Sequence, residues 1–195
     1  QNLILLDGVP VYNTNHLFGY LSTFNTDAIR EIRFYKGGIP SRYGGRLSSV
    51  VDVAMKEGNS KEAGGEVGLN PVSGRLMLEG PLKKEVASFM ISGRRSWLDI
   101  PLRVGQWISG NMETLGYAFF DVNAKINWII NPRNRVFLSY YQGRDGYFVN
   151  TKDSVGTDRY SFDWGNFTSV ARWNLVLSPR LFVNTSAYHS LYRFR

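Results

Sequence analysis

Apolar and polar residues alternate with a period of two through the second part of the chain. The clearest case is residues 120–130, where one face carries Phe120, Val122, Ala124, Ile126, Trp128 and Ile130, and the other carries Asp121, Asn123, Lys125 and Asn127. Such alternation is typical of β-strands with one apolar and one polar face. We therefore predict about seven antiparallel strands, over 63–70, 73–80, 85–95, 118–130, 135–147, 162–178 and 180–195.

The connections between these strands alternate in length. Three are short, at 81–85, 131–134 and 178–180, and two are long and polar, at 97–116 and 147–161. Bacterial outer-membrane barrels have short periplasmic turns and longer extracellular loops. Several predicted strands also reach the roughly 9–11 residues that cross a bilayer when tilted. The pattern predicts the wall of a transmembrane β-barrel, with its apolar face toward lipid and its polar face toward the lumen.

Two tryptophans fit this interpretation. Trp128 and Trp173 lie near strand ends beside short turns, where an aromatic girdle is expected at the membrane interface. The alternative is a soluble β-sandwich that binds carbohydrate, in which both would be core residues. Neither tryptophan decides the matter alone, and the alternation of loop lengths favours the barrel.

Residues 1–61 have a different pattern of apolar and polar residues. Short apolar runs at 3–6, 29–35 and 49–55 are separated by Gly-, Pro- and Asn-rich turns, and a short helix is predicted from Asn25 or Thr26. The polar stretch 56–61 marks the predicted domain boundary. We expect an N-terminal domain over 1–61 and barrel strands over 62–195.

The composition excludes several classes of site. The 195 residues include no cysteine and two histidines, and the net charge is +7. A disulfide scaffold and a thiolate metal site are thereby excluded, and two histidines cannot build a histidine-rich site, so no metal or cofactor is expected. The arginines are scattered over strands, loops and turns, which fits a polar lumen or charged rims and argues against a nucleic-acid partner.

No catalytic constellation is visible either. The chain has no Gly-x-Ser-x-Gly elbow and no phosphate-binding loop. Glu79 and Glu85 flank a turn and are interpreted as rim charges, and Asp7 before Gly8 is interpreted as a turn residue. We expect that the protein is not an enzyme.

The chain is not expected to close a barrel by itself. Seven strands are an odd number and fall below the eight of the smallest bacterial barrels. An open sheet edge in lipid would leave backbone groups unpaired at a cost of several kcal/mol each. Gln1 begins directly in a strand-like run, so a signal peptide is expected upstream, and the wall is expected to be part of a larger one.

Three segments carry a family resemblance. Residues 5–11 (Leu-Leu-Asp-Gly-Val-Pro-Val), 27–45 and 47–53 resemble the later half of the plug domain of TonB-dependent outer-membrane receptors. Gly80-Pro81 and residues 92–96 and 121–125 look like early barrel strands of Bacteroidetes-type members, SusC-like or carboxypeptidase-regulatory-like. The resemblance implies an all-β-dominated fold: a barrel of about 22 strands, of which about seven are present, around a small α/β plug.

This resemblance also implies a function. Family members import a nutrient through the Gram-negative outer membrane, which would here be an oligosaccharide, a peptide or a metal chelate. The implied partners are a TonB-type inner-membrane energy-coupling complex, outer-membrane lipid and, for the SusC-like type, a SusD-like surface lipoprotein. The coupling box and the first half of the plug would precede Gln1.

Two groups of site residues are predicted. A polar-aromatic segment could form the plug apex and contact a sugar or a peptide, or could merely pack on the barrel wall; its candidate residues are Tyr12, Asn13, Asn15, His16, Phe18 and Tyr20. His16 alone is no metal ligand. A second group is expected to form the tight turns of a plug, or plain surface turns: Asp7, Gly8, Lys36, Gly37, Gly38, Tyr43, Gly44 and Gly45.

Overall fold

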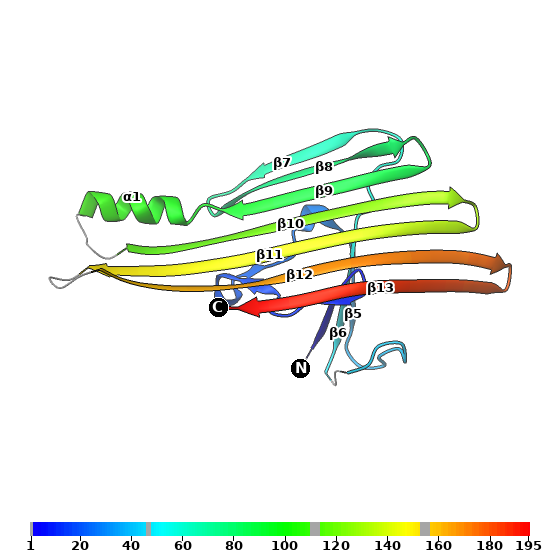
Figure 1. Cartoon of the computed structure of the whole chain (residues 1–195), viewed down its shortest axis with the longest axis horizontal. Coiled ribbons are helices and arrows are strands. Elements are labelled where there is room, and N and C mark those ends of the chain that lie inside the picture. The colour runs from blue at the N-terminus through cyan, green and yellow to red at the C-terminus, as the bar shows by residue number, and fades with distance from the viewer. Residues whose placement is uncertain (1, 46–47, 110–113, 153–156) are drawn as a thin grey trace.

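The computed structural model describes residues 2–45, 48–109, 114–152 and 157–195. The structure consists of two bodies: the N-terminal unit, residues 2–55, and the wall sheet, which contains the long strands β7–β13. Figure 1 shows the long strands lying side by side, with β5 and β6 of the N-terminal unit running across them. The predicted fold class, dominated by β-structure with a small N-terminal unit and a partial barrel wall, is confirmed.

A four-stranded sheet in the order β2-β1-β6-β5 forms the base of the N-terminal unit. Its strands are β1 (Leu3–Leu6), β2 (Val9–Pro10), β5 (Ile29–Tyr35) and β6 (Val50–Met55). β1 and β6 are parallel, with Leu3 opposite Val50, and the other pairs are antiparallel. The parallel pair requires a long crossover, which contains β3 (Asn15–His16), η1 (Leu17–Gly19), β4 (Leu21–Ser22) and η2 (Thr26–Ala28).

The predicted short helix forms as a single 3₁₀ turn, η2. The Asn25 side chain caps it by accepting a hydrogen bond from the Asp27 backbone N–H at 3.3 Å. The turn stops at Ala28 because the residues that follow are rich in β-formers and pair at once as β5.

The wall sheet is a meander in which each strand pairs with its neighbours in sequence. Its seven strands, the number predicted, are β7 (Gly64–Leu69), β8 (Ser73–Lys83), β9 (Ala87–Ser96), β10 (Thr114–Asn131), β11 (Asn134–Lys152), β12 (Thr157–Ser178) and β13 (Leu181–Phe194). The predicted domain boundary at residue 61 lies between the end of β6 and the start of β7.

The central wall strand β10 buries its polar face and exposes its apolar face over residues 121–130. On β10, Asp121, Asn123, Lys125 and Asn127 are each at most 5% exposed. Trp128 and Ile130, on the other face of the same strand, are each 52% exposed. A sheet of a water-soluble protein buries the opposite face. The face assignment predicted for β10 is confirmed, and the polar side chains pack against the N-terminal unit.

The main apolar cluster lies between the two bodies. From the N-terminal unit it takes Leu6, Val11, Ala28, Val53 and Met55, and from the wall sheet Met77, Met90 and Tyr141. A second cluster joins Tyr117, Phe119 and Trp164 of the wall to Leu17 and Leu21. The N-terminal unit is therefore built onto the wall sheet and shares its core.

The two long connections differ from their predicted form. The segment 97–116 contains a helix, α1 (Asp99–Ser109), and β10 begins already at Thr114. Pro101 and Asp99 suit the first turn of α1, and Ile100, Val104 and Ile108 recur at helical spacing. Among the described residues, no helix has both the length and the apolarity that spanning a membrane would need.

The second connection, 147–161, is mostly strand. β11 and β12 continue to pair as far as Lys152 opposite Thr157, so the expected long loop is wrong. Tyr147, Phe148 and Val149 are good β-formers, and the described parts of this connection, 147–152 and 157–161, contain no Pro or Gly. The hairpin therefore extends well past the α1 end of the neighbouring strands (Figure 1).

The turns at the opposite end are short, as predicted. β10 and β11 are joined by Pro132-Arg133, and β12 and β13 by Pro179-Arg180. Figure 1 places both at the end of the sheet away from α1. An outer-membrane barrel has the same asymmetry, with short turns at one end of its strands and longer connections at the other.

Candidate functional site

A buried charged cluster forms where β1 meets the wall sheet. Asp7 and Gly8 are the two loop residues of the β1–β2 hairpin, and both have positive φ (+48° and +81°), as a type I′ turn requires. The turn aims the Asp7 carboxylate at the wall. Its Oδ1 accepts hydrogen bonds from the Met55 backbone N–H at 3.0 Å and from Lys125 Nζ at 3.1 Å.

The same carboxylate has a third partner. Asp7 Oδ2 accepts a hydrogen bond from the Ser139 hydroxyl at 2.7 Å and lies 3.0 Å from Lys125 Nζ. Lys125 also donates to the Met55 carbonyl oxygen at 3.1 Å. Both charges are almost fully buried and fully hydrogen-bonded, which is the condition under which a buried ion pair is tolerated. Asp7 thus forms the predicted turn and also attaches the N-terminal unit to the wall sheet.

Gly8 is required by its surroundings as well as by its φ. Arg172 Nη2 donates to the Asp7 carbonyl oxygen at 2.6 Å, and a Cβ on Gly8 would lie 3.0 Å from that nitrogen. The Arg172 guanidinium also donates through Nε to the Ser186 hydroxyl at 3.3 Å. Arg172 of β12, which also binds Ser186 of β13, therefore contacts the same turn that binds β10 and β11.

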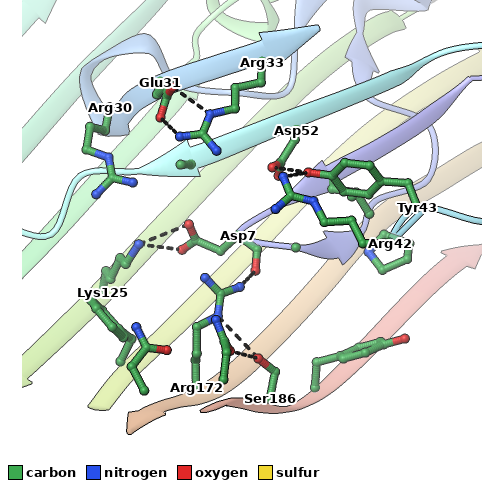
Figure 2. A pocket seen from close by; sticks show the side chains of 18 of the residues that line it. Asp7, Arg30, Glu31, Arg33, Arg42, Tyr43, Asp52, Lys125, Arg172 and Ser186 are labelled. Carbon is green, nitrogen blue, oxygen red and sulfur yellow. Dashed lines mark hydrogen bonds and ion pairs between the residues drawn. The ribbon is translucent and has the colours of Figure 1, made fainter. Parts of the chain in front are cut away.

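A cavity of about 660 Å³ opens beside this cluster, between the N-terminal unit and the wall sheet. Figure 2 shows cationic side chains from both bodies pointing into it. Among the described residues, six basic ones line it, Arg30, Arg33, Arg42, Lys125, Arg135 and Arg172, against four acidic ones, Asp7, Glu31, Asp52 and Glu57. Its lining is therefore strongly polar with an excess of positive charge.

Most of these charged side chains form ion pairs with one another. Glu57 accepts from Arg30 at 2.6 Å and from Arg135 of β11 at 2.6 Å, so one carboxylate links the N-terminal unit to the wall sheet. The Tyr43 hydroxyl donates to Asp52 Oδ2 at 2.9 Å. Burial, and then this contact with Asp52, raise the pKa of Tyr43 to about 12.

A second buried cluster surrounds His16, nearer the α1 end of the sheet. His16 Nε2 lies 2.8 Å from Asp121 Oδ1, and Nδ1 lies 2.9 Å from both carboxylate oxygens of Asp145. The imidazole is fully buried and stacks on Phe119, with ring centroids 4.1 Å apart. Arg94 completes the cluster by binding Asp121 Oδ2 at 2.6 Å.

Backbone groups of the crossover join the same cluster. The Leu17 N–H donates to the Tyr117 hydroxyl at 2.6 Å, and that hydroxyl in turn donates to Asp145. The Ser22 carbonyl oxygen accepts from Arg94 at 2.6 Å. The segment β3-η1-β4 is thus attached to three wall strands, β9, β10 and β11.

The predicted apex residues whose side chains the structure describes lie in two environments. Tyr20 is 89% exposed, Tyr12, Asn13 and Asn15 are also exposed, and His16 is fully buried. The side chain of Phe18 lies outside the part of the chain that the structure describes. The Tyr12 N–H donates to Asn166 Oδ1 at 3.0 Å, so this exposed segment is attached to β12 on one side and through His16 to β10 and β11 on the other.

The predicted turn residues do not form one group. Asp7, Gly8, Tyr43 and Gly44 line the cavity, whereas Lys36, Gly37, Gly38 and Gly45 do not. These last four lie in the connection between β5 and β6, where all three glycines have positive φ. Positive φ is the property that turns of this kind require.

Trp128 and Trp173 lie on the outer face of the wall sheet. Both are directly opposite Val136, one on each side of β11, so the three side chains form a row across β10, β11 and β12. The Trp173 indole N–H donates to Asn134 Oδ1 at 3.0 Å. The row lies beside the short turns, the position expected of an aromatic girdle.

Asp121 and Lys125 were placed on the polar face by their period, but Asp145 was not singled out. The period of two assigns Asp145 to the same face as Ser139, so the sequence held that signal. The pairing of His16 with residues 105 and 129 positions away has no local signal. Within the described ranges, no group of three His, Asp or Glu side chains is placed to hold a metal ion.

Chemically, the two clusters are attachment points. Each buries charges that satisfy one another across the boundary between the two bodies, and neither presents a nucleophile beside a base to a reactant. Water that enters such a boundary can replace each hydrogen bond, whereas it cannot replace an apolar contact. Buried ion pairs therefore hold the N-terminal unit firmly on the wall sheet, and water can replace them when the two bodies separate.

Comparison with known proteins gives the same architecture. Residues 1–51 match the family model of the TonB-dependent receptor plug domain. The whole chain resembles the crystal structure of the siderophore receptor PirA from Acinetobacter baumannii, with a TM-score of 0.52 and 17% identity, over 99% of this chain and 40% of that one. It also resembles a variant of the ferric enterobactin receptor PfeA from Pseudomonas aeruginosa, with a TM-score of 0.51 and 16% identity, over 99% and 41%.

These likenesses concern fold. At 15–20% identity they place the strands and the N-terminal unit, and the chain spans about two fifths of the length of these receptors. No curated protein sequence matches the chain. The matched family and both solved structures are receptors and not enzymes.

Proposed function

We propose that the chain is part of a TonB-dependent receptor, and that this receptor imports a nutrient across the outer membrane of a Gram-negative bacterium. In this proposal the N-terminal unit is the plug and the wall sheet is part of the barrel that encloses it. A bound nutrient at the outer side and energy from the inner membrane would together displace the plug.

The observation that carries the proposal is the polarity of the wall sheet. Along residues 121–130 of β10 the buried face is polar and charged, and the exposed face is apolar. An apolar exposed face is stable in contact with lipid, and a polar buried face can be rehydrated when the plug moves. A transporter needs both properties at once, and a soluble binding module needs neither.

The soluble β-sandwich alternative requires two sheets that pack apolar faces together. Over the described residues the long strands form a single sheet, and it packs its polar face on the N-terminal unit. We therefore retain transport as the proposed function.

Energy coupling would come from a TonB-type complex of the inner membrane. This partner is proposed because residues 1–51 match a domain whose family takes its name from that dependence. The test is uptake by cells that express the full-length receptor, with and without the coupling complex. Uptake that is lost when the complex is deleted supports the proposal, and uptake that persists contradicts it.

The substrate class is proposed from the exposed part of the apex segment, residues 12–20. Tyr12 and Tyr20 present aromatic faces and Asn15 presents an amide, a combination that suits an oligosaccharide or a peptide. A sugar or peptide substrate would agree with a SusC-like receptor that works with a SusD-like surface lipoprotein. A metal chelate is the second candidate, since the receptors of similar fold are described as siderophore and ferric enterobactin receptors.

Calorimetry on the full-length receptor separates these candidates. The titrants are a maltooligosaccharide, a mixed tripeptide and a ferric catecholate, each against the wild type and against Tyr20→Ala. The matched control is Phe182→Ala, an exposed aromatic residue beside the short turns. Binding of one titrant that weakens about tenfold or more in Tyr20→Ala, and not in Phe182→Ala, supports the apex assignment. Equal binding by all three proteins contradicts it.

A further inference from the structure

His16 lies at the centre of the contact between the apex segment and the wall sheet. It is completely buried, and both of its ring nitrogens face carboxylates, Asp121 at 2.8 Å and Asp145 at 2.9 Å. A neutral imidazole has one N–H and can donate to only one of them. The second nitrogen would then direct its lone pair at a carboxylate oxygen. The doubly protonated ring has an N–H on each nitrogen and can donate to both carboxylates.

The charges around His16 lead to the same conclusion. Each element packed against the ring contributes a group: Arg94 from β9, Asp121 and Tyr117 from β10, and Asp145 and Tyr141 from β11. Two carboxylates face one guanidinium, so a positive charge on His16 makes the buried cluster neutral. A neutral ring would leave one buried negative charge without compensation, which is costly.

We propose that His16 is a positioning residue: as an imidazolium it clamps the apex segment to β10 and β11, and loss of its proton releases the segment. The inference rests on the proposed function only for its purpose, which is to hold Tyr12 and Tyr20 in place for a ligand. Release would loosen three contacts together, because Leu17 and Ser22 bind the same cluster.

The direction of the pH effect follows from the surroundings. Burial lowers the pKa of His16, but hydrogen bonds and Coulombic attraction to Asp121 and Asp145 outweigh it, so the pKa lies above the ordinary 6.5. A raised pKa means that the clamp is fully formed below pH 6.5 and weakens as the pH rises through the pKa of the folded state. The apex segment is therefore held below pH 6.5 and is freed as the pH rises above the folded-state pKa of His16.

The test uses Thr23, which follows β4 and is 2% exposed. This chain contains no cysteine, so Thr23→Cys in the full-length receptor, with any cysteine outside the chain replaced by serine, gives a single reporter thiol. Its rate of labelling by a maleimide is divided by the labelling rate of a Tyr20→Cys variant, because residue 20 is an exposed position on the same segment. The ratio removes the intrinsic pH dependence of the reagent and reports opening of the segment.

Three backgrounds are compared with the wild type. His16→Leu removes the clamp, and we expect the ratio to rise roughly tenfold or more below pH 6.5 and to lose its pH dependence. His16→Gln keeps one hydrogen bond without a titrating charge, and we expect partial protection that does not change with pH. His189→Leu replaces the other histidine of the chain, which is exposed on β13, and should leave the wild-type profile unchanged.

Two results would overturn the proposal: a wild-type ratio that is flat between pH 6 and 10, or a rise on alkalinisation that persists in His16→Gln. Heat-modifiable mobility of each variant on a gel confirms that its barrel is folded. The labelling needs no ligand, so it tests the clamp independently of transport. A receptor that shows the predicted profile but takes up no substrate would contradict the proposed function and leave the clamp standing.

Discussion

Asp7 and Lys125 are 118 positions apart in the sequence, and their charged groups meet at 3.0 Å inside the boundary between the N-terminal unit and the wall sheet. The pair joins a β-hairpin turn to the middle of a long barrel strand. Both side chains also bind the backbone of Met55, at the end of β6. One ion pair thus fixes the two central strands of the N-terminal unit to the wall.

This pair should be strongly coupled in a double-mutant cycle. Lys125→Met leaves the Asp7 charge buried without its counter-ion, a situation that typically costs about 3–5 kcal/mol. Asp7→Asn added to Lys125→Met removes that charge, so the double variant should be more stable than the sum of the single changes predicts. Urea unfolding of the plug in the full-length receptor measures the cycle.

The control for this cycle is the exposed pair Glu31 and Arg33, which lies on one strand and should show little coupling. Additivity within about 0.5 kcal/mol for Asp7 and Lys125 would mean that their contact does not stabilise the attachment.

The linker between β6 and β7 should not tolerate a side chain at Gly58. Gly58 has φ of +78°, and a Cβ there would lie 2.1 Å from the carbonyl oxygen of Phe89 on β9. Gly58→Ala should push the linker away from β9, break the 2.8 Å hydrogen bond from Ser88 to the Glu57 carbonyl oxygen, and lower stability by at least about 2 kcal/mol. Gly64→Ala, where a Cβ meets nothing within 4 Å, is the matched control. Equal melting temperatures for the two variants would refute this packing.

Tyr43 should titrate far above an ordinary tyrosine. Its pKa is raised from 10 to about 12, by burial first and then by the contact with Asp52. Because the folded-state pKa is the higher one, the contribution of the neutral phenol to stability is complete below pH 10 and is lost as the pH rises through about 12. The difference in phenolate absorbance between the wild type and Tyr43→Phe isolates this group among the eleven tyrosines.

Asp52→Asn should lower this pKa toward 10 without reaching it, because the burial of Tyr43 remains. A wild-type midpoint near 10 would show that the hydroxyl is in contact with water and does not bind Asp52.

The wall sheet could be predicted from the sequence because its signal is local. The period of two in residues 120–130 assigned Asp121 and Lys125 to the inner face, and Pro132 and Pro179 marked the short turns. Strand ends were harder to predict. β11 and β12 run on to Lys152 and Thr157 because polar residues pair as well as apolar ones once the ladder has formed.

The candidate site was only partly predictable. Asp7 and Gly8 were identified as a turn, which they form, but nothing in residues 5–11 shows that Lys125 is the counter-ion. His16 lay within a polar-aromatic segment for which both contact with a ligand at the apex and packing on the barrel wall were left open. It is buried because the tertiary fold brings Asp121 and Asp145 to both sides of the ring. Contacts between bodies depend on packing and not on sequence spacing.

The central claim is that the wall sheet faces lipid on one side and the plug on the other. Nitroxide labels at single cysteines along β10, in the full-length receptor in vesicles, test it most directly by their collisions with oxygen and with a water-soluble nickel chelate. We predict high oxygen and low nickel accessibility at 122, 124, 126, 128 and 130, and low accessibility to both at 121, 123, 125 and 127. Nickel accessibility on the apolar face, or the absence of any alternation, would contradict the claim.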